Sequence, residues 1–159
     1  MSTGAAADLI VTLTDAERAA LRHGPGAALG EDDPRSYALE EASVGVHFLI
    51  SGSVGGGDGP LAFLASAASD AGEPGVLGDA RGRVLGPETV AAVADAIESL
   101  SAKLVRQRLV SDALRALPPF AGRALDDEDK EWLLAVLQGL MTFMRQAARA
   151  RASLWVAAR

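Results

Sequence analysis

The clearest hydrophobic pattern is helical and lies in the second half of the chain. Gly86 suits the N-cap of a helix, and Pro87 suits the first helical position, where its missing amide hydrogen does no harm. A single seam of apolar residues follows at alternating spacings of three and four: Val90, Val93, Ile97, Leu100 and Leu104. A shorter helix is predicted to end at Pro118-Pro119 and to carry Leu109, Ala113, Leu114 and Leu117.

The last helix is predicted to be the longest. It opens within LDDEDKEW, residues 125–132, and extends to about Arg151. Apolar residues line one of its faces, namely Leu133, Val136, Leu137, Leu140, Met144, Ala147 and Ala148. Acidic residues gather in its first turns and arginines in its last turns, which complements the helix dipole. SLWVAA, residues 153–158, predicts a closing strand.

The beginning of the chain predicts a strand followed by a short helix. DLIVTL, residues 8–13, is apolar and β-branched, as strands are. Thr14 and Glu17 have the spacing of a capping box, so a helix is expected from Asp15 to about Arg22. HGPG stops this helix, and residues 24–36 are predicted to form a loop because glycine, proline and charged residues dominate them.

The middle of the chain leaves two assignments open. Residues 37–50 show near-helical spacing, but the run 44–50, VGVHFLI, also fits a strand. Residues 60–66 fit either a strand or a buried helical turn. Residues 69–82 are rich in turn formers, and RVL, residues 83–85, predicts a short strand.

Together these elements predict a single α+β domain over residues 1–159, because neither a repeat nor an interdomain linker interrupts them. We expect a small mixed or mostly antiparallel sheet with packed helices, and a long C-terminal helix followed by a last strand. The few aromatic residues are expected to anchor the core: Tyr37, Phe48, Phe63, Phe120, Trp132, Phe143 and Trp155.

Charge and composition narrow the possible functions. A net charge of −6 weighs against nucleic acid as the main partner, since phosphate binding needs concentrated positive charge. The chain has no cysteine, which excludes disulfides, thiolate catalysis and cysteine-ligated zinc. The N-terminus lacks the basic region of a signal peptide, and no run of about 18 apolar residues predicts a membrane span. We therefore expect a soluble, cytoplasmic protein.

The stretch SGSVGGGDGP, residues 51–60, invites comparison with phosphate-binding loops. Gly52 and Gly57 have the glycine spacing of a P-loop, but Asp58 occupies the lysine position and would repel phosphate. The dinucleotide pattern also fails, because Pro60 stands where its third glycine belongs. The stretch is predicted to be a connector, with high mobility from about Val54 to Asp58.

Histidine is the residue type most often used in catalysis near neutral pH, and the chain contains two. His47 stands in an apolar run with only Glu40 and Glu41 as nearby acids, so we favour a structural role over a catalytic one. His23 follows a helix end, where the dipole favours histidine. The two are too far apart in sequence for a recognisable zinc pair.

The charged clusters favour helix-end roles over binding. Carboxylates from Asp126 to Glu131 could attract a divalent cation, but they lack the spacing of a calcium loop and begin a helix. Arginines near the C-terminus are expected to be dipole partners and surface charge rather than a basic patch: Arg145, Arg149, Arg151 and Arg159. Trp132 and Trp155 are predicted to lie in the core or at its edge.

Three segments resemble an uncharacterised bacterial family typified by YfbM: VGVHFLISG at 44–52, RVLGPETV at 83–90 and the closing residues 133–156. The family usually has tryptophan where this chain has Ser43, and an aromatic residue where it has Val84, so a pocket shaped by that tryptophan would be altered here. The resemblance implies a small single-domain α+β fold with helices on a modest sheet. It implies no activity and no catalytic residues.

Two functions follow as hypotheses, and whether the protein is an enzyme stays open between them. The favoured hypothesis is a non-enzymatic binding or protein-interaction domain, whose acidic surface suits a basic protein partner. The alternative is a small hydrolase or transferase with His47 as general base and Arg83 as anion anchor. No cofactor, metal, nucleic acid or membrane is predicted as a ligand. Partner identity and oligomeric state are not defined by the sequence.

Overall fold

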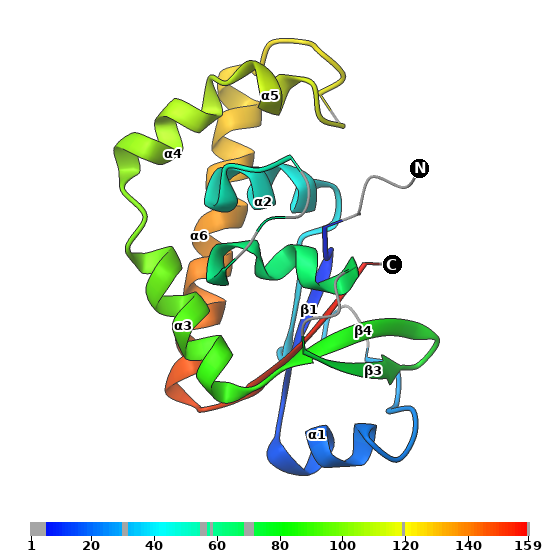
Figure 1. Cartoon of the computed structure of the whole chain (residues 1–159). Helices are drawn as coiled ribbons and strands as arrows, with labels where there is room; N and C mark the ends of the chain where they lie inside the picture. Colours follow the sequence, from blue (N-terminus) through cyan, green and yellow to red (C-terminus); the bar gives the residue numbers. More distant parts are fainter. Residues whose placement is uncertain are drawn as a thin grey trace.

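Five strands form one antiparallel sheet in the computed structural model, which describes residues 6–29, 32–54, 57, 59–68, 72–118 and 120–158. The strand order is β2-β1-β5-β4-β3, and all four neighbouring pairs are antiparallel (Figure 1). The strands are β1 (Leu9–Leu13), β2 (Ser36–Ala38), β3 (Glu73–Leu77), β4 (Ala80–Leu85) and β5 (Ser153–Ala157). The C-terminal strand thus lies at the centre of the sheet, between β1 and β4. The predicted α+β class with a mostly antiparallel sheet is confirmed.

Both predicted ends of the chain fold as expected. β1 covers the predicted first strand, and Thr14 and Glu17 form the capping box of α1 (Asp15–Leu21). The longest helix, α6 (Asp127–Arg149), is followed directly by β5. These elements are encoded locally, by cap residues and by a regular apolar face, so sequence patterns predict them well.

The apolar seam predicted as one helix is divided into two. α3 (Pro87–Glu98) begins at the Gly86 N-cap as predicted, but the chain then turns and α4 (Ala102–Leu109) starts anew. The Ser101 hydroxyl accepts a hydrogen bond from the Leu104 amide and caps this second start. The apolar pattern did not indicate this break, because the spacings of three and four between apolar residues continue unchanged across the turn. α5 (Asp112–Arg115) is shorter than predicted, since Ser111 caps another new start.

A strand was missed among the residues predicted as turns. β3 and the first half of β4 form a hairpin through residues 78 and 79, within the region 69–82. Gly75 and Gly82 lie opposite each other in this hairpin, and the Trp155 indole lies over them. A Cβ atom at Gly82 would stand 2.7 Å from the indole nitrogen, so only glycine fits. The glycines that look like turn formers in the sequence are here a requirement of packing.

The two open assignments are resolved as helices. Residues 37–50 contain the end of β2, a 3-10 turn η1 (Glu40–Ala42) and α2 (Ser43–Ser51), so VGVHFLI is helical. Residues 60–68 form the 3-10 segment η2 (Pro60–Ala68), which is kinked at Ala62. Tyr37 lies in β2, not in the helix that the spacing favoured. Its hydroxyl donates to the Val136 carbonyl of α6 at 2.8 Å.

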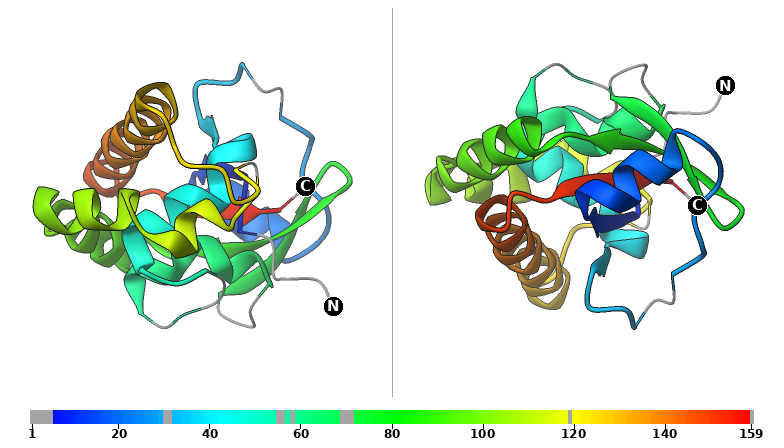
Figure 2. Two further views of the ribbon diagram at one scale, coloured as in Figure 1. Left: turned by 90° about the horizontal axis from the view of Figure 1, so that it is seen from above. Right: turned by 90° about the horizontal axis from the view of Figure 1, so that it is seen from below.

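Alternate residues of the strands face two cores of different size. Ile10, Leu85 and Leu154 join the larger core, which α2, η2, α3 and α6 cover. Leu9, Val84 and Trp155 join the smaller core, which includes Leu21 of α1. Figure 2 shows α2 in front of the sheet when it is seen from above, and α1 in front when it is seen from below. The sheet is therefore the middle layer of three.

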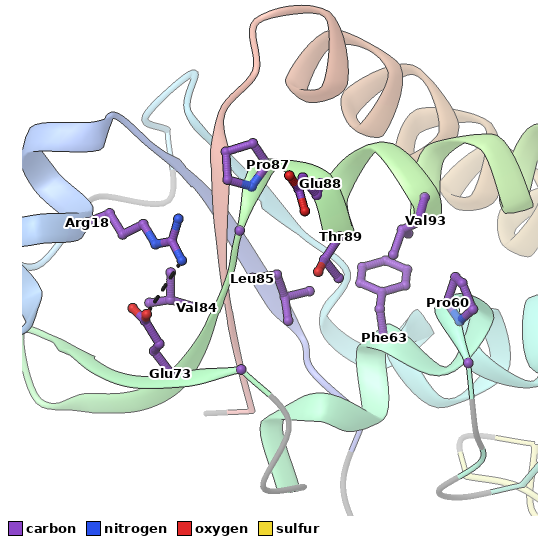
Figure 3. A pocket seen from close by; sticks show the side chains of 14 residues that line it. Arg18, Pro60, Phe63, Glu73, Val84, Leu85, Pro87, Glu88, Thr89 and Val93 are labelled. Atoms are coloured by element: carbon purple, nitrogen blue, oxygen red, sulfur yellow. Dashed lines mark ion pairs between the residues drawn. The ribbon is translucent and has the colours of Figure 1, made fainter.

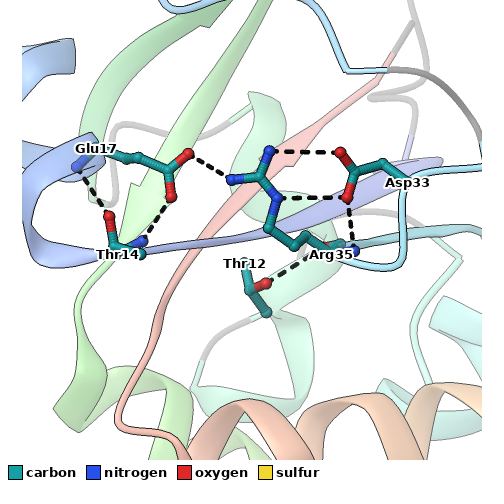
Figure 4. Close-up of polar contacts among 5 residues, drawn as sticks. All are labelled: Thr12, Thr14, Glu17, Asp33 and Arg35. Atoms are coloured by element: carbon teal, nitrogen blue, oxygen red, sulfur yellow. Dashed lines mark hydrogen bonds and ion pairs between the residues drawn. The ribbon is translucent and has the colours of Figure 1, made fainter.

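The predicted loop 24–36 is tied to α1 by a polar network (Figure 4). The Arg35 guanidinium donates to Glu17 at 2.6 Å and to Asp33 at 3.3 Å. Glu17 in turn accepts from the Thr14 amide in the capping box. Arg35 thus joins the start of α1 to the strand-forming segment that follows the loop.

Candidate functional site

His47, the first candidate from the sequence, lies in the middle of α2 with 1% of its surface exposed. The Ser51 hydroxyl stands 3.4 Å from its Nε2 atom and donates to the His47 carbonyl at 2.7 Å. Arg83, the second candidate, lies on β4 opposite Pro74 and Val156. α2 packs against η2, α4 and α6, whereas β4 lies between β3 and β5. Neither residue lines the cleft described below.

The glycine stretch begins by ending a helix. Gly52 is the C-cap of α2 and adopts the left-handed conformation at a φ of 74°. The Arg108 guanidinium donates to the Leu49 and Ile50 carbonyls at 2.8 and 3.0 Å, and so satisfies the last turn of α2. The mobility predicted for residues 54–58 falls largely outside the described residues, because 55, 56 and 58 are not among them.

The remaining charged candidates serve the helix ends. Asp126 caps α6 and forms a capping box with Asp129. Arg123 pairs with Asp129, and its hydrogen bond is the main cause that lowers the pKa of that carboxyl to about 2. Arg145 pairs with Glu98 of α3. Among the described residues, no three histidine or carboxylate side chains gather as metal ligands.

The other residues singled out in the sequence lie as follows. His23 is exposed just after α1, and Arg149 and Arg151 are exposed around the end of α6, while Arg159 is outside the described residues. Trp155 is 1% exposed and donates from its indole to the Gly75 carbonyl at 3.1 Å. Trp132 packs partly buried against the larger core. Both tryptophans therefore lie where the sequence placed them, in the core and at its edge.

The structure shows a cleft that the sequence did not indicate. It has a volume of about 900 Å³ and lies where β4 passes into α3 (Figure 3). Arg18 of α1 and Glu73 of β3 border one side, and Pro60 and Phe63 of η2 border the other. The first turn of α3 closes the cleft with Pro87, Glu88 and Thr89.

The floor of the cleft is apolar. Phe63, Val84, Leu85 and Val93 line it, and each belongs to the buried core. These residues come from η2, β4 and α3, and Val84 belongs to the smaller core while the other three belong to the larger one. The cleft therefore opens where the two cores meet, at one end of the sheet.

The rim of the cleft is charged. Glu73 accepts from Arg22 at 2.8 Å and lies 3.5 Å from Arg18. The hydrogen bond from Arg22, with Arg18 nearby, holds the pKa of the Glu73 carboxyl below its usual range, so this group remains ionised near neutral pH. A carboxyl with a lowered pKa is a weak general base at that pH. The chemistry of the rim therefore suits recognition better than proton transfer.

The rim also includes the start of α3, over which the Arg18 side chain lies. A Cβ atom at Gly86 would stand 3.3 Å from the Arg18 guanidinium, so glycine lets this side chain lie over the helix start. Gly86 provides no side-chain cap for α3, and Glu88 in the first turn complements the helix dipole. Glu88 is exposed and makes no ion pair within the described parts of the chain.

Sequence reasoning missed the cleft because its residues come from five separate elements, α1, η2, β3, β4 and α3. Arg18 and Glu73 are more than fifty residues apart, and each looks like ordinary surface charge in the sequence. The one local signal was Gly86-Pro87, which marked the helix start and was correctly read as structural. Nothing in a linear pattern indicates that η2 and α1 approach the same helix end.

Both edges of the sheet are poorly suited to binding a further strand. β2 has only three residues. At the other edge, the Val76 carbonyl of β3 already accepts from the Gly26 amide at 2.8 Å. Pro74 is the next residue of β3 whose backbone faces the same way, and it has no amide hydrogen to donate. Surface recognition is therefore expected at side chains, not by strand addition.

Comparison with known proteins supports the fold and adds no activity. Residues 11–156 match the family described as "Domain of unknown function (DUF1877)". The crystal structure of YfbM from Escherichia coli, a protein of unknown function, is similar with a TM-score of 0.63 and 13% sequence identity. The alignment covers 95% of this chain and 98% of that one. No curated protein sequence matches this chain. None of the described helices is long and apolar enough to cross a membrane.

Proposed function

We propose, from the premise that this chain belongs to the DUF1877 family of unknown function, that it is a non-enzymatic binding domain. Its binding surface is the cleft between α1, η2 and the start of α3. The observation that carries the proposal is the combination of an apolar floor with a rim of charged groups. Concave apolar sites with a few oriented polar groups are the common form of recognition sites.

The partner that fits this cleft is a protein segment with an apolar side chain beside a basic one. The apolar side chain would enter the cleft over Phe63 and Val93, where desolvation favours it. Arg18 and Glu73 are paired with each other, so Glu88 is the rim charge that remains for a partner. The whole protein carries a net charge of −6, which adds long-range attraction for a basic partner.

The alternative of a hydrolase or transferase that uses His47 and Arg83 has less support. A general base must come within hydrogen-bond reach of its substrate. His47 is only 1% exposed inside α2, so a substrate would reach it only after the surrounding helices moved. A partner that binds in the cleft requires no such movement, because the charged groups of the rim already lie at the protein surface.

The test is a selection of peptides from a displayed random library against the purified protein. We expect enriched peptides to combine an apolar residue with a neighbouring lysine or arginine. Ala92 is exposed on α3 and lines the cleft, whereas its neighbour Ala91 is exposed and does not. Ala92→Trp should fill the cleft and weaken peptide binding about tenfold or more, as loss of an anchor pocket does. Ala91→Trp is the matched control and should leave binding unchanged.

Two results would contradict the proposal. One is that no peptide is enriched above an unrelated acidic protein of similar size. The other is that the enriched peptides bind Ala92→Trp and Ala91→Trp equally well. Glu88→Lys tests the charge preference separately, because it should lower affinity for basic peptides while leaving the apolar floor intact.

A further inference from the structure

A second hollow lies on the helical side of the molecule, between α4 and α6. It has a volume of about 310 Å³ and is mainly apolar. Leu134, Leu137 and Met141 of α6 form one wall, and Val105 of α4 forms the other. Ile97 of α3 and Leu100 in the turn after it close one end. We call this hollow the α4–α6 groove. None of its residues lines the cleft described above.

The groove exists because the helix predicted from the apolar seam is broken. α3 packs along α6, but after the turn at residues 99–101 the next helix, α4, packs on α2 instead (Figure 1). Leu100 in this turn and Val105 of α4 line the hollow together with residues of α6. α4 and α6 do not cover each other beyond this turn, and apolar side chains of both helices line an open hollow.

The walls of the groove have the spacing that a helix would match. On α6 the lining residues are 134, 137, 138 and 141, which recur at the i, i+3, i+4 and i+7 positions of a single helical face. On α4 they are 102, 105 and 106, again three and four apart. Two such ridges with an apolar floor between them are the arrangement by which proteins bind one face of an amphipathic helix.

The charge on one wall identifies the kind of helix. Residues 99–111 contain Lys103, Arg106 and Arg108 and no acidic residue, in a protein whose net charge is −6. Arg108 is occupied with the carbonyls of α2. Lys103 and Arg106 are exposed and form no ion pair in the described part of the chain, and Arg106 lines the groove itself. One wall of an apolar groove is therefore locally basic.

We infer that the α4–α6 groove docks an amphipathic helix of a partner protein, with acidic residues beside its apolar face. The apolar face lies over Leu134, Leu137 and Met141, and the acidic residues face Lys103 and Arg106. The inference does not depend on the proposed function of the cleft, because the two surfaces share no lining residue and favour partners of opposite charge.

The test uses two designed helical peptides of about 18 residues, a length at which amphipathic helices become stable enough to bind as helices. Both carry leucines at the spacing of the groove walls, and they differ only in flanking residues, which are glutamate in one and lysine in the other. With fluorescein-labelled peptides and anisotropy as the readout, the glutamate peptide should bind at least about tenfold more tightly than the lysine peptide at low salt. That preference should shrink as salt is added.

Two variants place the binding in the groove. The double variant Lys103→Glu/Arg106→Glu should reverse the preference between the peptides, and Met141→Asp should weaken binding of both. A double variant with matched charge change, Arg81→Glu/Arg149→Glu, alters exposed residues outside the groove and should leave both affinities unchanged. Circular dichroism melting curves confirm that each variant is folded before binding is measured.

The inference is overturned if neither peptide binds, if both bind equally, or if the Lys103→Glu/Arg106→Glu variant retains the original preference. It is also overturned if light scattering shows that the protein is a dimer and Met141→Asp makes it monomeric. In that case a second copy of this chain would cover the groove in place of an acidic helix.

Discussion

The two faces of the sheet are stabilised in different ways, although the same strands form both. On the helical face, Leu85 and Leu154 pack beneath long helices with a continuous apolar core. On the α1 face, the single short helix leaves less apolar surface to bury. There the Trp155 indole lies against the backbone of two glycines, and Arg35 links α1 to the following loop. The small apolar area that α1 buries is thus compensated by the close packing of Trp155 and by the polar contacts of Arg35.

The largest effect is expected on the helical face. Leu140 of α6 is fully buried in the larger core. Leu140→Ala should lower the free energy of unfolding by about 3 kcal/mol, because it removes apolar contacts and leaves a cavity. Urea unfolding followed by circular dichroism measures this. Ala135→Ser, at an exposed position of the same helix, is the control and should change stability by less than about 0.5 kcal/mol.

A smaller but substantial loss is expected on the α1 face from adding a single methyl group. A Cβ atom at Gly82 would meet the Val156 carbonyl oxygen at 2.5 Å and the Trp155 indole at 2.7 Å. Neither is the end of a flexible side chain, so Gly82→Ala should cost about 2 kcal/mol through overpacking. Gly24→Ala has open space around the new methyl and should not destabilise the protein. If the two variants were equally stable, the α1 face would be loosely packed.

The smallest effect concerns the polar link. Glu17 has its pKa lowered, chiefly by the hydrogen bond from the Thr14 backbone and with help from Arg35. Glu17→Gln keeps an acceptor for the Thr14 amide and removes the charge facing Arg35. The loss should be about 0.5 kcal/mol at neutral pH, since this pair is partly exposed.

The pH dependence gives this last prediction its sign. A carboxyl whose folded pKa is lowered stabilises the protein above its unfolded pKa, and this contribution is lost as pH falls through the folded value. The stability difference between the wild type and Glu17→Gln should therefore be full at pH values above 4.5, the ordinary pKa of a glutamate carboxyl, and disappear in stronger acid. Unfolding curves over a pH series measure it. A difference that persists undiminished in acid would show that Arg35 does not act through the Glu17 charge.

The features that the sequence predicted well are those encoded by neighbouring residues. The capping box at Thr14, the Gly86-Pro87 start of α3 and the acidic first turn of α6 each need only a few consecutive positions. Errors arose where tertiary contacts set the local structure. The β3–β4 hairpin looked like turns because its glycines accommodate Trp155, which lies more than seventy residues away.

The candidate sites show the same contrast between local sequence signals and tertiary structure. His47 and Arg83 attracted notice because their residue types suit catalysis, yet His47 is buried within α2, and Arg83 on β4 is only partly exposed and lines neither hollow. The cleft and the α4–α6 groove were not predicted, because each is formed where elements distant in sequence meet or part. Residue type alone does not indicate whether a side chain reaches a surface.

The sequence by itself determined the α+β class, the starts of α1, α3 and α6, the strand at each end and the acidic net charge, because these depend on local spacing and composition. Only the tertiary structure decided that β5 lies at the centre of the sheet, that the apolar seam breaks into α3 and α4, and where the surface is hollow. The physical reason is that a pattern of apolar residues specifies which side chains must be buried. It does not specify which other element buries them, and the cleft and the groove occur where that covering is incomplete.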